Sequence, residues 1–367
     1  MEVFLPIAEV QINVVLFLFV SFIIGFLSGL FGVGGGFLMT PLLIFMGIPP
    51  AYAVANEANN ILASSSSGTL THWFKKTLDV KIGWLIVIGG LLGTFTGILT
   101  FSYFKGIGKI DIVIALAYMY VLAIIGSFML RDGLVELNLL KKKIIVKKKL
   151  HTHYWIHGLP FRMRFKTSQV YESALVPLLL GVVVGFVSAI MGVGGAFLMV
   201  PAMIYLIGMP TKLVPGTSLF VTIFVTGFVT ISHAFTYNTI DLMLVLILIT
   251  GSIGGVHAGQ KIGQKLDGSQ LKSLLAILML SVGLLMAYET FFKNGENGKA
   301  SLMLPTDKIA EIGEFGNTIY NLSNQYPIVY GILSIFIALS AGILVSYIRR
   351  QISKRINAPK TIPPKAI

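Results

Sequence analysis

The sequence contains no cysteine among its 367 residues, which excludes disulfides, iron–sulfur clusters and cysteine-ligated zinc. Charged residues are scarce as well, at 12% against about 25% in soluble domains. The first residues include Glu2 and Glu9 but no Lys or Arg, so the basic segment that opens a signal peptide is missing. We therefore expect the first apolar run to be a retained membrane span.

Long apolar runs dominate what is present. The chain is 55% hydrophobic with a mean hydropathy of +0.85, and runs of about 20 apolar residues recur from end to end. The strict alternation of an outer-membrane barrel is missing, so the spans should be helices. The sequence predicts an all-α polytopic membrane protein, with no cofactor, no metal and no enzymatic activity.

One glycine-rich stretch occurs twice. Residues 25–41 and 185–201 are identical at 11 of 17 positions at an offset of 160. The correspondence continues beyond this stretch: His72 is equivalent to His233 at an offset of 161, and Asp79 is equivalent to Asp241 at an offset of 162. Two halves with one origin are therefore expected.

Each half is predicted to hold about five helical segments. The short apolar segment after each glycine cluster cannot cross a bilayer alone, so it is expected to be one arm of a broken span. An odd number of passes gives the halves opposite orientations, the inverted repeat of many transporters. The expected segments are 10–31, 37–46, 51–70, 82–104 and 110–130, then 173–191, 197–207, 213–235, 240–262 and 271–291, with one extra span at 327–348.

Net charge is +13 and is concentrated in two places. Residues 131–172 hold ten Lys/Arg and three acids, and residues 349–367 hold six Lys/Arg and no acid. Because basic loops stay inside, the N-terminus is predicted outside and the C-terminus in the cytoplasm of a multi-pass inner-membrane protein. The expected divisions are a first repeat (1–130), a basic cytoplasmic loop (131–172), a second repeat (173–291), an extracytoplasmic linker (292–325), an extra span (326–348) and a basic tail (349–367).

The two glycine breaks are the predicted substrate site. A half-helix that starts in mid-membrane exposes free N–H groups and a partial positive charge, which suit a small anion. Glycines in membrane helices also serve close packing, which is the structural alternative. The candidate substrate-binding residues are Gly32, Gly34, Gly35, Gly36, Asn56, Asn59, Ser64, Gly192, Gly194, Gly195, Gly216, Thr217, Ser218 and Thr222.

Three ionisable residues are candidates for proton coupling. Glu57 is a carboxyl group inside a span, which is costly to bury and so indicates function. A position near the water boundary, or pairing with His72 or a Lys, is the alternative. His72 and His233 lie at matching span ends, where structural roles compete with proton transfer.

The basic loop is predicted to contain a hairpin. Residues 150–156 and 161–166 flank His157-Gly-Leu-Pro160, the turn between the two strands. His151, His153 and His157 could hold a metal, but no carboxylate or Cys lies beside them. We therefore expect a solvated or headgroup-facing hairpin.

Taken together, these motifs resemble the sulfite exporter TauE/SafE family of membrane anion transporters. The resemblance rests on Gly32-Val-Gly-Gly-Gly-Phe-Leu-Met-Thr-Pro41, its second copy from Gly192 to Pro201, Pro215-Gly-Thr-Ser218 and the run ending at His72. It implies export or exchange of a sulfur oxyanion or sulfonate by alternating access. The expected partners are a small anionic substrate and the lipid bilayer, with a homo-oligomer left open and no nucleic acid.

Two other classes compete with the transporter. One is an anion channel or a membrane sensor, in which loop 131–172 binds a partner or anionic lipid. The other is an intramembrane hydrolase, with Ser67 or Ser218 as nucleophile and His72 or His233 as base. The substrate, the coupling ion and the direction of transport stay open.

Overall fold

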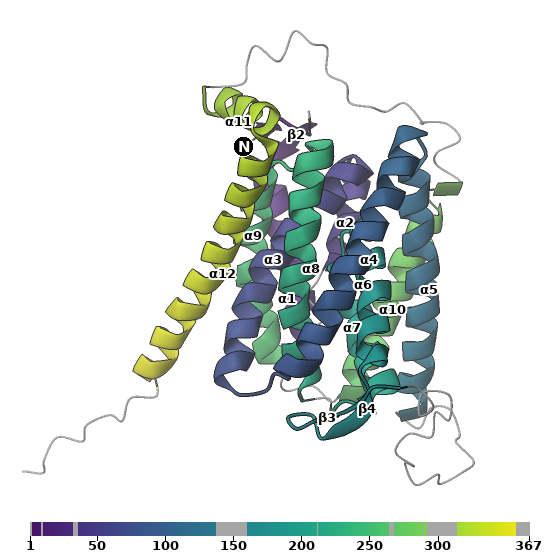
Figure 1. Ribbon diagram of the computed structural model, residues 1–367. Coiled ribbons are helices and arrows are strands. Elements are labelled where there is room, and N and C mark those ends of the chain that lie inside the picture. Colours follow the sequence, from purple (N-terminus) through teal and green to yellow (C-terminus); the bar gives the residue numbers. More distant parts are fainter. Residues whose placement is uncertain are drawn as a thin grey trace, which may run out of the picture.

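The computed structural model describes residues 2–8, 10–31, 36–136, 160–210, 212–263, 268–288, 290–291 and 314–356 (Figure 1). The first half contains β1 (Glu2–Leu5), β2 (Val10–Asn13), α1 (Val14–Phe31), α2 (Gly36–Phe45), α3 (Pro50–Phe74), α4 (Val80–Gly106) and α5 (Ile110–Glu136). The second contains β3 (Arg162–Phe165), β4 (Val170–Ser173), α6 (Leu175–Met191), α7 (Ala196–Ala202), the π-helical turn η2 (Met203–Ile207), α8 (Val214–Tyr237), α9 (Leu242–Gly263) and α10 (Gly268–Tyr288). The helices α11 (Glu314–Gln325) and α12 (Pro327–Ile356) follow.

Within this described part, five helices are long and apolar enough to cross a bilayer, which supports a multi-pass membrane protein. They are the spans Val80–Gly106, Ile110–Val135, Val214–Tyr237, Leu242–Gly259 and Pro327–Ile348. The predicted short arms after the glycine clusters are α2 and α7 with η2. The polar helix α3 has the length of a span. It is packed against α8, α9 and α12, and α1 packs against α9.

The structure corrects the start of the first helix. Residues 10–13 were expected to be helical, but they form strand β2, which pairs antiparallel with β1. Val10 and Ile12 are buried while Gln11 and Asn13 are exposed, the period-two pattern of a strand. The Asn13 Oδ1 atom then accepts from the N–H groups of Val15 and Leu16, so it ends the strand by capping α1.

A second hairpin lies before α6. Strand β3 lies within the predicted 161–166 segment and pairs antiparallel with β4. The other predicted strand, 150–156, lies outside the described residues together with His151, His153 and His157. Glu2 lies opposite Asn13 in the first hairpin, and Arg162 lies opposite Ser173 in the second, again an offset of 160. Both halves therefore begin with the same hairpin, and β4 crosses the boundary predicted at 172–173. Helix α11 occupies the end of the predicted linker.

Glycines set the closest helix contacts. A Cβ atom on Gly25 of α1 would lie 2.2 Å from the Ser252 carbonyl oxygen of α9, and one on Gly29 would lie 2.1 Å from that of Val256. Both positions advance by four residues, so α1 and α9 run parallel. In the same way Gly89 and Gly93 of α4 meet Leu178 and Val182 of α6. Each pair joins one half to the other at backbone contact distance.

Helices α3 and α8 cross between these pairs. Gly68 of α3 packs on Leu219 near the start of α8, whereas Leu62, earlier in α3, contacts Gly227, later in α8. The two helices are therefore antiparallel. Helix α12 covers both of them, and α5 packs against α10 (Figure 1).

Asp79 and Asp241 bind the hairpins to these helices. The Asp79 carboxylate accepts from the backbone N–H groups of Lys81 and Ile82, capping α4, and from Ser168 in the β3–β4 turn at 3.0 Å (N) and 2.6 Å (Oγ). Each of its oxygens is thus used, one for the helix and one for the hairpin of the other half.

The Asp241 carboxylate repeats this arrangement in the other half. It accepts from the N–H groups of Met243 and Leu244 in α9, and from Ile7 and Ala8 in the β1–β2 turn at 2.9 and 3.4 Å. Both carboxylates are buried. Each half therefore holds the hairpin of the other through one aspartate.

Gly255→Ala should destabilise the protein by about 1–3 kcal/mol, because the new methyl group would lie 2.0 Å from the Phe22 carbonyl oxygen of α1. Gly254→Ala is the matched control, since its methyl group would meet Phe22 at an ordinary 3.5 Å. Thermal unfolding of the purified protein measures both. Equal melting temperatures for the two variants would contradict the backbone contact.

Asp79→Asn should also destabilise the protein, by about 1–3 kcal/mol, because the amide keeps one acceptor oxygen where the carboxylate uses two. Asp111→Asn removes an exposed carboxylate at the start of α5 and serves as the control. Limited proteolysis at the β3–β4 hairpin would report its release. An unchanged cleavage rate in Asp79→Asn would argue against the clamp.

Candidate functional site

The polar face of α3 is enclosed by its neighbours. Glu57 is 1% exposed and Asn60 is 4% exposed, although both lie on a helix of the membrane region. The Asn60 Nδ2 atom donates to Glu57 Oε2 at 3.0 Å, and Ser252 Oγ of α9 donates to Asn60 Oδ1 at 2.7 Å. Three polar side chains thus form one chain from α3 to α9. No Lys or Arg takes part in it.

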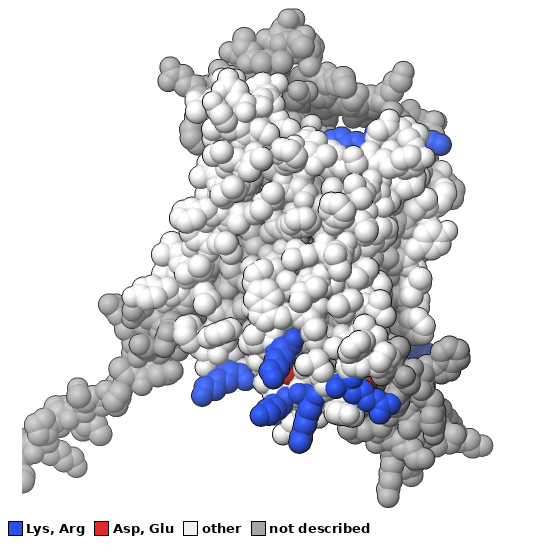
Figure 2. Space-filling view, viewed as in Figure 1, with Lys and Arg blue, Asp and Glu red and all other residues white. Residues whose placement is uncertain are grey.

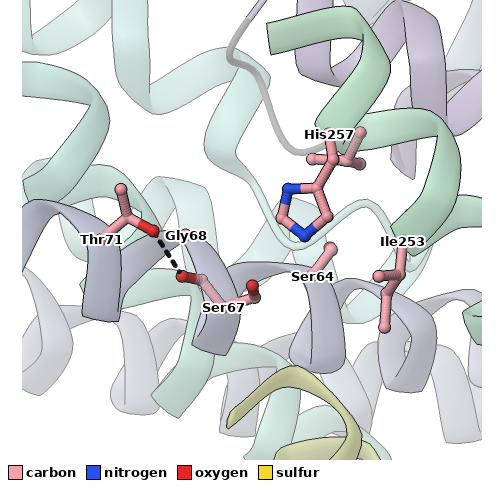
Figure 3. A pocket seen from close by; sticks show the side chains of 7 residues that line it. Ser64, Ser67, Gly68, Thr71, Ile253 and His257 are labelled. Carbon is pink, nitrogen blue, oxygen red and sulfur yellow. Dashed lines mark hydrogen bonds between the residues drawn. The ribbon is translucent and has the colours of Figure 1, made fainter. Parts of the chain in front are cut away.

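Two cavities follow this face of α3. The first, here called the Glu57 cavity, is lined by residues of α1, α2, α3 and α9: Ile24, Gly25, Ser28, Met39, Glu57, Asn60, Ser64, Ser252 and Val256. The second, called the His257 cavity, is lined by Ser64, Ser67, Gly68, Thr71, Ile253, Val256 and His257. Figure 3 shows the His257 ring of α9 facing Ser64 and Ser67 on α3.

The cavities are adjacent and narrow. They share Ser64 and Val256, so they form one polar track from Glu57 towards the end of α3. Each has a volume of about 10 Å³ for the centre of a water-sized sphere, which is room for one water molecule. The conformation is therefore closed around this track.

The second half does not repeat these polar groups. At the offset of 161, Glu57, Asn60 and Ser64 correspond to Ser218, Val221 and Val225. Ser218 Oγ donates to the Pro215 carbonyl oxygen of its own helix. Glu57, Asn60 and Ser64 are therefore particular to the first half, and Ser252 and His257 of the second half complete the track.

Two of the predicted substrate ligands, Asn56 and Thr217, accept hydrogen bonds from backbone N–H groups of the scaffold. Asn56 Oδ1 accepts from Asp241 N at 2.8 Å, and Thr217 Oγ1 accepts from Asp79 N at 3.0 Å. Asn56 and Thr217 are repeat equivalents, as are the two aspartates. Their side chains orient the residues that carry the clamps, away from the two cavities.

The second glycine break is present and packed. Helix α6 ends at Met191 and α7 begins at Ala196, and Gly192, Gly194 and Gly195 between them have φ near +70°, which favours glycine. A Cβ on Gly194 would lie 2.9 Å from the side chains of Ile61, Thr222 and Thr226. Thr222 Oγ1 also lies 3.3 Å from the Gly194 carbonyl oxygen. Side chains therefore fill the space around Gly194.

The first break lies mostly outside the described residues, which exclude Gly32, Gly34 and Gly35. Gly36 is described, and a Cβ there would lie 2.1 Å from Ile61 Cδ1 and 3.0 Å from the Val193 carbonyl oxygen of the second break. The Phe37 and Phe197 rings, which are repeat equivalents, have centroids 5.8 Å apart. The two breaks therefore approach each other, and Ile61 lies between them.

The candidate histidines do not pair with serines. His72 Nδ1 lies 2.8 Å from Thr77 Oγ1, and His233 Nε2 lies 3.4 Å from the Ala189 carbonyl oxygen. Gly216 packs against His72. These contacts give no Ser–His dyad for the hydrolase hypothesis at Ser67 or Ser218.

Asn59 and the missed residues complete the comparison with the sequence. Asn59 is fully buried, and neither the oxygen nor the nitrogen of its side-chain amide has a hydrogen-bond partner among the described residues.

Ser28, Ser252 and His257 line the cavities but were not among the candidates. The sequence could have indicated these three residues, because each is a polar residue inside an otherwise apolar span. In the described part, no three His, Cys, Asp or Glu side chains gather as a metal site.

Comparison with known proteins identifies the family. The family model described as "Sulfite exporter TauE/SafE" matches residues 17–286, which end before α11 and α12. The chain is 27% identical to the "Probable membrane transporter protein YjnA" of Bacillus subtilis over 71% of its own length and 94% of that protein. It is 27% identical to the "Probable membrane transporter protein MJ0441" of Methanocaldococcus jannaschii, over 74% and 94%. No solved structure matches the chain.

Tyr118→Phe should lower the free energy of unfolding by about 1–3 kcal/mol, because it removes a hydrogen bond that supports the second glycine break. The buried Tyr118 hydroxyl of α5 donates to the Met191 carbonyl oxygen at 2.7 Å, where α6 ends and an intrahelical partner is missing. Tyr120→Phe, an exposed position on the same helix, is the control. Thermal unfolding compares them, and equal stability would remove Tyr118 from the support of the break.

Proposed function

Because the chain belongs to the sulfite exporter TauE/SafE family, we propose that it is a secondary transporter of a small anion. The proposed substrates are sulfite, a sulfonate or a related sulfur oxyanion, exported or exchanged by alternating access. The observation that carries this proposal is the polar track along α3, a row of buried and half-buried hydroxyl groups in a chain whose relatives are named as membrane transporters.

The helix directions support an inverted repeat. Helices α3 and α8 are repeat equivalents, and their glycine contacts make them antiparallel. The β1–β2 hairpin before α1 and the β3–β4 hairpin before α6 lie at opposite ends of the molecule (Figure 1). Halves of opposite direction are the usual basis of rocking transporters.

The His257 cavity is the proposed entry to the anion path. The Ser64 and Thr71 hydroxyl groups now donate to backbone carbonyl oxygens, so they would have to rotate to donate to an oxyanion, together with Ser67 and the His257 imidazole and without a buried Lys or Arg. The cavity lies towards the end of α3, which is followed by Lys75 and Lys76. Figure 2 shows most of the Lys and Arg drawn in blue at the lower end of the molecule, with a smaller group at the upper end. The positive potential at the lower end would attract an anion. We assign this end to the cytoplasm, with the N-terminus outside.

The glycine breaks are the proposed moving parts. Ile61 fills the contact between Gly36 and Gly194 in the closed conformation. Rocking of one half against the other would withdraw Ile61 and free the N–H groups at the start of α7. Those groups, with Thr222 and Ser64, would then bind the anion near the midplane.

The test is uptake of ³⁵S-sulfite into proteoliposomes that contain the purified full chain. Saturable flux above that of protein-free vesicles is expected, with competition by sulfonates. Flux that rises linearly with concentration and carries net current would favour an anion channel instead. Absence of flux for sulfite and for sulfonates would overturn the proposal.

Ser67→Ala should lower this flux by about fivefold, because it removes one hydroxyl group from the path. Ser66→Ala is the matched control, since its Oγ atom donates to the Ala63 carbonyl oxygen and lies against Gly342 of α12. Initial rates, normalised to reconstituted protein, measure both. Equal rates for Ser66→Ala and Ser67→Ala would place the path elsewhere.

A further inference from the structure

The Glu57 cavity has the wrong charge for an anion. Its one ionisable lining residue is Glu57, and none of its lining residues is Lys, Arg or His. The Asn60 amide donates one hydrogen bond to this carboxylate, which does not neutralise it. A buried carboxylate without a compensating charge is costly, and either a proton or a small cation beside it removes that cost.

The lining also has the donor atoms of a hard cation site. Oxygen-bearing side chains converge from three helices: Ser28 of α1, Glu57, Asn60 and Ser64 of α3, and Ser252 of α9. The Ser252 hydroxyl donates its proton to Asn60 and the Ser64 hydroxyl donates to the Ile61 carbonyl oxygen, which leaves their oxygen lone pairs free to bind a cation. Hard cations select such oxygen ligands.

The size of the cavity narrows the choice. It has room for about one water molecule, which is enough for a single dehydrated ion. The neighbouring His257 cavity shares Ser64 and Val256 with it, so a cation here would lie next to the proposed anion path. Opposite charges on adjacent sites favour each other's binding.

We propose that the Glu57 cavity is a sodium site, in which Glu57, Asn60, Ser28 and Ser252 supply oxygen ligands to the ion that is coupled to anion movement. The coupling rests on the proposed function, but the site itself does not. Because Ser218, Val221 and Val225 replace Glu57, Asn60 and Ser64 in the second half, one sodium ion is expected per chain.

Binding of ²²Na⁺ to the purified full chain tests the site without any transport measurement. Wild-type protein should bind sodium saturably, with about one ion per chain, and potassium should compete weakly. Glu57→Gln should abolish binding, and Ser252→Ala should weaken it by about tenfold. Ser21→Ala is the control, because this buried hydroxyl of α1 donates to the Phe17 carbonyl oxygen outside the cavity.

A second measurement covers variants that fold poorly. Replacing choline by sodium at constant ionic strength should raise the melting temperature of wild-type protein and of Ser21→Ala, and leave that of Glu57→Gln unchanged. Wild-type protein that neither binds ²²Na⁺ nor gains stability from sodium would overturn the proposal.

The outcome for transport separates the two proposals. Sulfite flux that depends on a proton gradient and continues without sodium would overturn the coupling of sodium to anion movement and leave the transporter intact. Sodium binding without flux of any sulfur oxyanion would do the reverse.

Discussion

Close contact between glycines and backbone carbonyl groups is the constraint on which the structure depends. Gly25 and Gly29 bring α1 against α9, and Gly89 and Gly93 bring α4 against α6. Lipid chains are as apolar as leucine, so burial of apolar surface does little to join the two halves. Dispersion contacts at backbone distance must supply that attraction, and any side chain at these positions would separate the halves.

This packing makes a polar helix tolerable in the interior. Helix α3 carries amides, hydroxyls and a carboxyl group that would be costly to expose to lipid. With α1 and α9 in contact beside it, the Asn60 amide of α3 binds both the Glu57 carboxyl group and the Ser252 hydroxyl group. Asp79 and Asp241 each accept hydrogen bonds from N–H groups at the start of one helix and from the hairpin turn of the other half. Each half is thereby completed by the other.

Duplication and function are separate in this fold. The clamps, the hairpins and the pairing of Phe37 with Phe197 obey the repeat. The polar track does not, because Glu57 and Asn60 correspond to Ser218 and Val221 in the sequence of the second half. The Glu57 carboxyl group therefore has no counterpart in the other half, although the scaffold around it is duplicated.

The membrane class, the repeat, the positions of most helices and the family could be predicted from the sequence, because apolar run length, glycine clusters and their spacing are local signals. Which polar side chains line the cavities and which hydrogen-bond to the scaffold could not be predicted. Asn56 and Thr217 lie on the same helices as Glu57 and Ser218, yet they bind the backbone of Asp241 and Asp79. The hairpins and the participation of Ser252 and His257 likewise depend on segments far apart in the chain. These contacts follow from the packing of the helices, which selects the neighbour that each polar face meets.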